Sequence, residues 1–246
     1  FVRPAHGLVA LHDDQIVPVT ALGLTASNTT TGHRFEAQKS VITLNNADSY
    51  AEQLRTEGAV IASFKERKAD IAAQLKAAAE KEGLIAVEDE DLLDEVTALV
   101  ELPNVLLGQY EVEFLDVPQE CLVLTMKANQ KYFPLVDSKG KLTNKFLITS
   151  NINPADPSAV IGGNERVVRP RLADAKFFFD QDRKKTLESR IESLDKVVYH
   201  NKLGSQGERN KRVVKLAGDI AKQLGDANLV TKTEQAAYLS KADLIT

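Results

Sequence analysis

In the first sixty residues, the apolar positions are grouped in short runs that predict β-strands. Residues 2–11 and 15–22 are apolar runs rich in valine and leucine, and His12-Asp13-Asp14 between them predicts a hairpin turn. A polar loop follows, and a further strand is predicted within residues 35–44. This part of the chain therefore contains hairpins, with no long helix.

Helical spacing begins after this region. Ser63 and Glu66 form the Ser-x-x-Glu pattern of a capping box, which predicts a helix start, and Gly83 predicts its end. The apolar face of this helix is predicted at Phe64, Ile71, Leu75 and Ala78. Residues 92–99 predict a second, shorter amphipathic helix that ends before Pro103.

Strand-like residues return at positions 105–115, and Pro118 suits the first turn of a helix through Cys121 and Met126. Residues 132–136 and 142–148 flank a turn at 137–140 and predict a hairpin. The turn cluster Asn151-Ile152-Asn153-Pro154 predicts a domain boundary. The expected fold class is α+β, with a mixed α/β domain at 1–153 and a helical segment at 154–246.

Every element beyond that boundary is predicted to be helical. Leu187, Ile191, Leu194 and Val198 recur at helical spacing. Ser205 and Glu208 repeat the capping box and open a helix whose apolar face is predicted at Val213, Leu216, Ala217, Ile220 and Leu224. Pro170 is costly inside a helix, by about 3 kcal/mol, so a kink or a new helix start is expected there.

Charge is distributed unevenly along the chain. Residues 1–164 carry 14 Lys and Arg against 23 Asp and Glu, a net charge of −9, whereas residues 165–222 carry 15 against 9, a net charge of +6. A basic segment beside an acidic one is typical of a nucleic-acid surface, and also of solvated helical faces. Charge alone favours the solvated helical face.

Composition limits the chemistry that the chain can carry. It is 43% hydrophobic and 27% charged, which is typical of a soluble globular protein, and it has no apolar run of about 20 residues. Cys121 is the single cysteine; it is expected on an apolar helix face as a small hydrophobe, and it favours a reducing cytoplasm. Because the chain opens on Phe1 inside a strand-like run, it is expected to be cut from a longer protein.

No motif with catalytic or metal-binding spacing is present. The chain lacks a phosphate-binding loop, a dinucleotide fingerprint and a zinc-protease motif. The histidines are scattered, so neither they nor the lone cysteine predict a metal site: His6, His12, His33 and His200. No catalytic residue and no metal ligand are predicted.

The stretch from Gly163 to Asp180 is the densest in informative residues. Arg166, Arg169 and Lys176 can share one helical face, while Val168 and Leu172 share another with Ala175 and Phe179. The basic face can meet RNA phosphates or pair with carboxylates nearby in the sequence, such as Glu165 and Asp174.

This stretch, Gly-Asn-Glu-Arg-Val followed by Arg-Leu-Ala-Asp-Ala-Lys-Phe-Phe, resembles a signature of bacterial glycyl-tRNA synthetase beta subunits. Other matches lie in the order of that family: residues 1–6, Thr31-Gly32-His33-Arg34-Phe35, Thr125-Met126 with Gln130-Lys131-Tyr132-Phe133, residues 199–205 and residues 239–244. The resemblance covers the whole chain. Gly7 departs from it, because many members have tryptophan there.

The resemblance implies a division of labour between two subunits. A separate alpha subunit makes glycyl-adenylate from glycine and ATP, and the beta subunit holds tRNA(Gly) in an α2β2 heterotetramer that uses ATP and Mg²⁺. It further implies that the first domain is similar to the editing domain of the phenylalanyl-tRNA synthetase beta subunit, and that the helical segment opens an HD-like domain. The chain by itself is then expected to be inactive and to need no cofactor.

Together these observations predict a non-catalytic, tRNA-positioning role in the cytoplasm. The predicted tRNA-facing residues are Arg166, Arg169, Arg171, Lys202, Arg209, Lys211 and Arg212. An editing-type deacylase and a purely structural scaffold stay open as alternatives. An HD-type phosphohydrolase is disfavoured, because the one His-Asp pair, His12-Asp13, lies in a predicted turn of the first domain.

Overall fold

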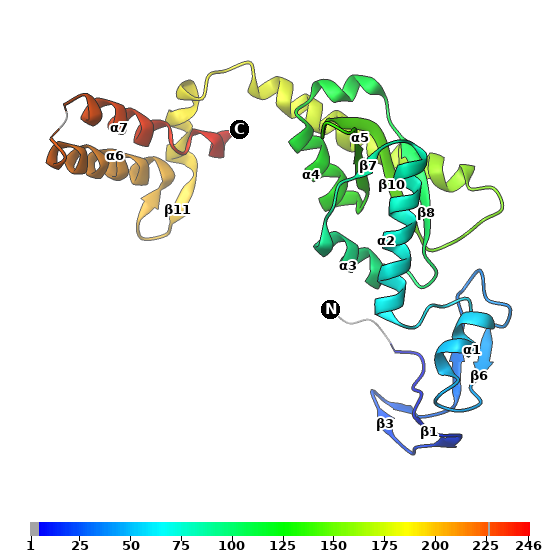
Figure 1. The fold of residues 1–246 in the computed structure, drawn as a ribbon. Coiled ribbons are helices and arrows are strands. Elements are labelled where there is room, and N and C mark those ends of the chain that lie inside the picture. Colours follow the sequence, from blue (N-terminus) through cyan, green and yellow to red (C-terminus); the bar gives the residue numbers. More distant parts are fainter. Residues whose placement is uncertain (1–4, 226) are drawn as a thin grey trace. The chain divides into compact units, whose positions relative to one another are not determined.

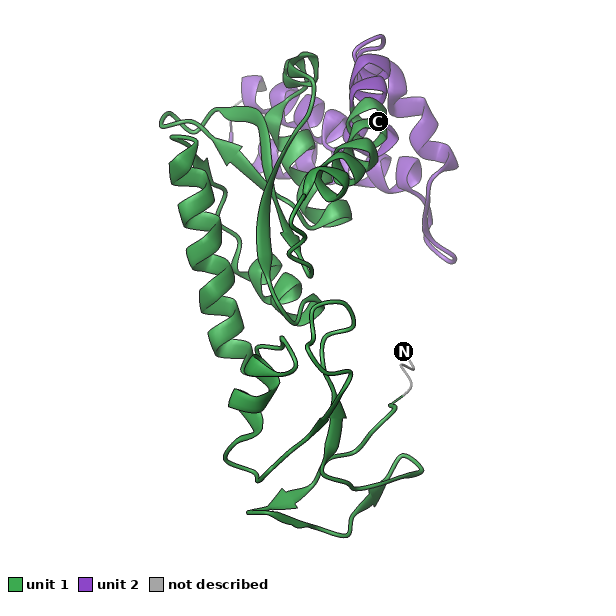
Figure 2. Cartoon of the chain, turned by 90° about the vertical axis from the view of Figure 1, so that its right-hand side faces the viewer, with its two compact units in different colours: residues 1–175 green, residues 176–246 purple. Residues whose placement is uncertain are grey.

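The chain folds into two compact units, residues Phe1–Ala175 and Lys176–Thr246, in a computed structural model that describes residues 5–225 and 227–246 (Figures 1 and 2). The architecture is mixed helix and sheet, as the predicted α+β class requires. The start of the predicted strand at 2–11, and most of the motif at 1–6, lie outside the described residues. Across the described part of the chain, no helix has the length and apolar character needed to cross a membrane.

Unit 1 opens with small antiparallel strand pairs followed by a short helix. The strands are β1 (Leu11–His12), β2 (Gln15–Ile16), β3 (Thr20–Ala21), β4 (Leu24–Thr25), β5 (Thr29–Thr31) and β6 (Val41–Thr43), and the helix is α1 (Tyr50–Thr56). The predicted turn between residues 12 and 15 is confirmed, since Leu11 pairs with Ile16. The strand predicted within 35–44 is confirmed as β6, whose Ile42 is buried with Leu44 and Leu54 from α1.

A four-stranded antiparallel sheet forms the centre of unit 1, in the order β7-β9-β10-β8. Its strands are β7 (Ile85–Ala86), β8 (Asn104–Gln109), β9 (Phe133–Val136) and β10 (Leu142–Ser150). The hairpin predicted around 137–140 is confirmed, with Gly140 at a φ of 76° that favours glycine. The strand predicted over 105–115 ends at Gln109, because the chain then turns into η1 (Val112–Asp116) and packs Phe114 edge-on against Tyr110.

The outer edge of β8 is occupied by side chains. The Val105 N–H donates to Gln74 Oε1 at 2.9 Å, and the Gln109 N–H donates to Glu165 Oε1 at 3.0 Å. Gly108, on the same strand, leaves room for the ring of Phe146, which would lie 2.7 Å from an added Cβ. This edge strand therefore has two of its amide groups bonded within unit 1.

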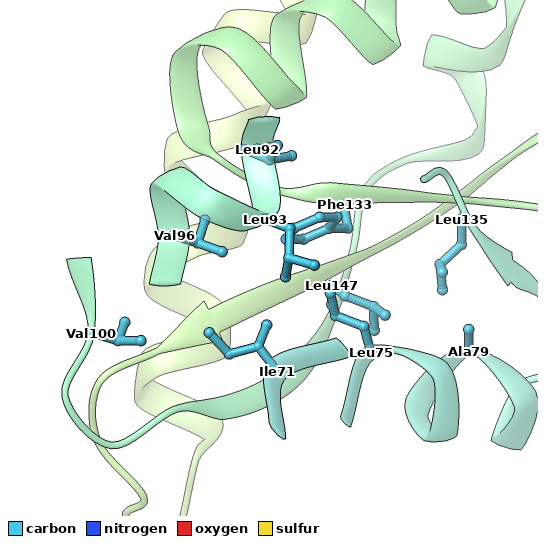
Figure 3. Close-up of a cluster of buried hydrophobic side chains, with 10 residues drawn as sticks. All are labelled: Ile71, Leu75, Ala79, Leu92, Leu93, Val96, Val100, Phe133, Leu135 and Leu147. Atoms are coloured by element: carbon cyan, nitrogen blue, oxygen red, sulfur yellow. The ribbon is translucent and has the colours of Figure 1, made fainter. Parts of the chain in front are cut away.

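Two helices, α2 (Phe64–Lys81) and α3 (Glu90–Leu99), pack against the sheet (Figure 3). Ile71, Leu75 and Ala79 of α2 are buried against side chains from α3 and the sheet: Leu92, Leu93, Val96, Val100, Phe133, Leu135 and Leu147. The predicted helix start is confirmed, since Ser63 Oγ accepts from the Glu66 N–H. The Glu66 carboxylate binds Arg55 at 2.6 Å.

Helix α4 (Gln119–Gln130) begins directly after Pro118, as predicted. The expected burial of Cys121 is wrong, because that residue is exposed. Leu122 and Met126 form the buried face, and a residue one position before Leu122 is turned about 100° away from it. The apolar neighbours of Cys121 in the sequence therefore did not show which way its side chain points.

Helix α5 (Ser158–Asp182) contains Pro170 in its interior, so no new helix starts there, and a kink at the proline stays a prediction. Val168 and Leu172 are fully buried on either side of the proline, and their packing holds the helix in place. The chain divides between Ala175 and Lys176, inside α5, whereas the turn at 151–154 comes before this helix. The predicted domain ranges of 1–153 and 154–246 differ from the two compact units accordingly.

Unit 2 contains strands as well as helices, which corrects the all-helical expectation. Its elements after α5 are η2 (Glu188–Lys196), β11 (Val198–His200), β12 (Gly204–Ser205), α6 (Gln206–Gln223), α7 (Ala227–Leu239) and η3 (Ala242–Ile245). Ile191 and Leu194 are buried as predicted, but Val198 lies in β11 and is 72% exposed. The capping box of Ser205 and Glu208 is confirmed, with both hydrogen bonds present.

The predicted core face of α6 is wrong. Leu216, Ile220 and Leu224 are 60–70% exposed, and Val213 is exposed too. The buried face consists of small or polar residues, Gly207, Asn210, Gly218 and Ala221. Asn210 Nδ2 donates to the Tyr238 carbonyl at 2.9 Å, so α7 packs on this face. The spacing of apolar residues identified the apolar stripe of α6. A different face is buried, because α7 packs on the side of α6 whose small residues allow the two helices to approach more closely.

Candidate nucleic-acid interface

Four of the predicted basic residues lie close together in unit 2. Lys202 lies in the turn between β11 and β12, and Arg209, Lys211 and Arg212 lie in the first two turns of α6. The capping box at Ser205 fixes the start of α6 directly after β12. The sequence therefore places a hairpin and the beginning of a helix beside one another. We call these four residues the basic hairpin surface.

Side-chain contacts tie the hairpin to the helix. The Arg209 guanidinium lies over the Tyr199 ring, 4.8 Å from its centroid, and Arg212 Nη2 donates to the Leu203 carbonyl at 3.1 Å. Lys211 Nζ is 3.5 Å from Asp195 Oδ1, and both side chains are largely exposed. Such an exposed pair contributes little, about 0–1 kcal/mol, so it leaves Lys211 available to another anion.

The other three predicted residues lie on α5, within unit 1. Arg169 Nε binds Glu111 Oε1 at 2.5 Å and joins the helix to the start of η1. The backbone N–H of Glu111, together with Arg169, holds the pKa of that carboxyl below its usual range. Arg169 therefore pairs with Glu111 inside unit 1, and not with Glu165 or Asp174, the carboxylates expected from the sequence.

Arg166 and Arg171 are exposed on α5, and the described residues show no ion pair for either. Of the carboxylates expected to pair with them, Glu165 accepts a hydrogen bond from the Gln109 N–H instead. The seven predicted residues thus divide between the two units. Among the described residues, the structure brings together the four of the basic hairpin surface.

Tyr199 is a candidate contact that the sequence prediction missed. It is 41% exposed and carries Arg209 on its ring. An exposed aromatic ring with a stacked guanidinium suits an unpaired base or a sugar–phosphate backbone. The signal was available in the sequence, because Tyr199 comes three residues before Lys202.

The basic hairpin surface carries groups that bind anions. Arginine and lysine supply hydrogen-bond donors together with a positive charge. No group of three or more His, Cys, Asp or Glu residues within 5–225 and 227–246 is arranged to hold a metal ion. The surface is suited to phosphate oxygens.

Comparison with known proteins gives the family. The family model described as "Glycyl-tRNA synthetase beta subunit" matches residues 1–246, the whole chain. The chain belongs to this family. The "Glycine--tRNA ligase beta subunit" of Methylobacillus flagellatus is 71% identical over 246 residues, and those of Thiobacillus denitrificans and Dechloromonas aromatica are 69% and 67% identical.

This beta-subunit chain is matched over its full length by each of these three relatives, but it spans only 35% of their length. The residues described above therefore belong to one part of such a subunit.

Proposed function

We propose that this chain is a non-catalytic, tRNA-positioning part of a glycyl-tRNA synthetase beta subunit. In this proposal the alpha subunit forms glycyl-adenylate with ATP and Mg²⁺, and the beta subunit presents tRNA(Gly) to it in a cytoplasmic α2β2 enzyme. The first domain, residues 1–153, is then the editing-like domain of the family, without editing activity, and residues 154–246 are the start of an HD-like domain. Family membership supports this assignment.

The basic hairpin surface is the observation that carries the proposal. Lys202, Lys211 and Arg212 are exposed, and Arg209 lies over the Tyr199 ring, in a segment with a net charge of +6 within a chain of net charge −4. Contacts with phosphates release counterions, so affinity falls as salt rises. RNA duplexes are bound mainly through their shape, their phosphates and the 2′-hydroxyl, so this surface is expected to show little base preference.

The test is a charge reversal on the basic hairpin surface of the complete synthetase. The double variant K211E/R212E is expected to weaken tRNA(Gly) binding and to reduce the slope of log K against log salt by about one for each phosphate that the variant no longer neutralises. Affinity is measured at several salt concentrations by filter binding or fluorescence anisotropy, with circular dichroism to confirm that α6 is retained.

The matched control is K139E/K141E, which makes the same change of charge at the exposed turn between β9 and β10. This control is expected to leave the salt slope unchanged. If K211E/R212E is folded and binds tRNA with wild-type affinity and slope, the basic hairpin surface does not face tRNA, and the scaffold alternative gains support.

A further inference from the structure

Helix α6 carries a row of apolar side chains that the described residues leave uncovered. Leu216, Ile220 and Leu224 are 60–70% exposed, and Val213 at the start of the row is 36% exposed. We call these four residues the apolar stripe. Single exposed leucines are ordinary on a protein surface, but a contiguous apolar patch marks an interaction site.

The spacing of the apolar stripe suits contact with another helix. Its members follow one another at intervals of three, four and four residues, which keeps them on one face of α6. At a rise of about 1.5 Å per residue the stripe is about 16 Å long. Leu216, Ile220 and Leu224 form a ridge of residues four apart, and such a ridge fits a groove on the surface of a second helix.

The apolar stripe lies between the face that α7 covers and a basic face. Helices α6 and α7 lie side by side (Figure 1), and Ala221 in the buried face of α6 is about 100° around the helix from Ile220. Lys215 and Lys211 are about 140° and 180° from Ile220. A helix on the stripe would therefore pack beside α7 and leave Lys211, a member of the basic hairpin surface, exposed.

The chemistry of the apolar stripe does not suit RNA. Proteins hold RNA through its phosphates and 2′-hydroxyls and through stacking of its bases on aromatic rings or guanidinium planes. Valine, leucine and isoleucine side chains offer no hydrogen-bond donor, no charge and no ring. The occupant of the stripe is therefore another protein segment.

Charge argues against a second copy of this chain as the occupant. Helix α6 carries Lys or Arg at positions 209, 211, 212, 215 and 222, against Glu208 and Asp219, which gives five basic and two acidic residues and a net charge of +3. Two α6 helices packed stripe to stripe would bring two such charges together, and like charges repel. A neutral or acidic helix meets no such repulsion.

The same polypeptide offers a large choice of covering segments. The chain spans 35% of the length of its relatives, so most of such a beta subunit lies outside residues 1–246. A segment joined to α6 by the polypeptide is present at an effective concentration in the millimolar range when the connection can reach. A separate subunit has no such advantage.

We propose that a helix of the same beta subunit, from the part of the polypeptide outside residues 1–246, covers the apolar stripe. This helix has an apolar face, neutral or acidic flanks and a length of at least about twelve residues, enough to follow the 16 Å of the stripe. It completes a core that α6 and α7 begin. The proposal rests on membership of the beta-subunit family, and it does not depend on tRNA binding by the basic hairpin surface.

The experiment measures how fast cysteines on α6 react with a maleimide in the full-length beta subunit, without alpha subunit and without tRNA. L216C and I220C are made separately in a C121S background, because Cys121 is exposed. Mass spectrometry of the peptide that contains α6 gives each rate, and division by the rate in urea removes differences in intrinsic reactivity. Circular dichroism checks that each variant is folded.

The matched control is K215C, because Lys215 is exposed on the same helix and points away from the apolar stripe. K215C is expected to react at close to its rate in urea. L216C and I220C are each expected to react at least about tenfold more slowly than K215C, because a covered side chain reacts only when the covering helix opens. Their rates should not depend on the concentration of the subunit.

Three results would overturn the proposal. Equal rates at the three positions in the folded subunit would show that the apolar stripe stays in contact with solvent. Slow reaction of L216C and I220C only after addition of alpha subunit would place the stripe at the interface between the subunits. Slow reaction that is lost on dilution would identify the occupant as a second copy of the beta subunit.

Discussion

The buried tyrosines predict a loss of stability at alkaline pH. Burial raises the pKa of Tyr110 and Tyr132 above the ordinary value of 10, for Tyr132 to about 12. Because each folded pKa lies above the unfolded one, the contribution of both tyrosines is complete below pH 10 and decreases above it, and that of Tyr132 is lost as pH rises through 12. The free energy of unfolding is therefore expected to decrease over this range.

The variant Y132F should make that decrease shallower. At pH 8 it loses only the hydrogen bond to Asn164, about 1 kcal/mol. Urea unfolding at several pH values between 8 and 12 measures both effects. Y50F, which alters a partly exposed ring, is the control and should keep the wild-type pH dependence. A wild-type slope in Y132F would contradict the assignment of the alkaline loss to Tyr132.

Among single residues, those whose contacts lie within a few positions of the chain were predicted correctly. The capping box of Ser205 and Glu208 spans four consecutive residues, and both of its hydrogen bonds are present. Cys121 and Lys131 were not predicted, because tertiary packing decides the exposure of the first and the left-handed end of α4 decides the backbone of the second. Lys131 lies in a stretch that carried the family resemblance, but that stretch indicated no role for it.

Elements were predicted well where one periodicity extends over many residues or a strong turn separates two runs. Helix α2 and the hairpin of β9 and β10 are examples. The hairpin of β11 and β12 was missed because each strand has only two or three residues, too few to establish an alternation. Helix α6 was located correctly, but its exposed side was misjudged, because periodicity does not say which neighbour covers a face.

The exposure of α6 predicts unequal costs for similar truncations. In this chain L216A and I220A should each change the free energy of unfolding by less than about 0.5 kcal/mol, because both side chains already contact solvent. L194A should cost about 2–5 kcal/mol, because Leu194 is fully buried with Ile191 and Ala242. Chemical denaturation of the three variants is the measurement. A cost above about 2 kcal/mol for L216A or I220A would show that this face is covered.

At the scale of the whole molecule, the α+β class and the family followed from the sequence, whereas the division into units did not. A turn signal at 151–154 was easy to identify, but the compact units separate inside a helix, where no composition change marks the place. The uneven charge pointed to residues 165–222, which belong to both units, and side-chain contacts then showed how the cations of each unit are engaged.

The proposed division of labour predicts that this chain alone neither activates glycine nor charges tRNA. No phosphate-binding motif is present in its sequence, and exposed basic residues such as Lys211 can bind a phosphate group only as a contact. ATP–pyrophosphate exchange with the purified chain should stay at background, and addition of alpha subunit serves as the positive control. Glycine-dependent exchange by a preparation free of alpha subunit would refute the prediction.

The outer edge of β8 has a consequence for how the molecule behaves among copies of itself. An open strand edge is a template on which another chain can add a strand, and repeated addition leads to fibres and precipitates. Gln74 and Glu165 bond the amide groups of Val105 and Gln109 that such a strand would need. Removal of both side chains would leave the edge of this six-residue strand open to aggregation.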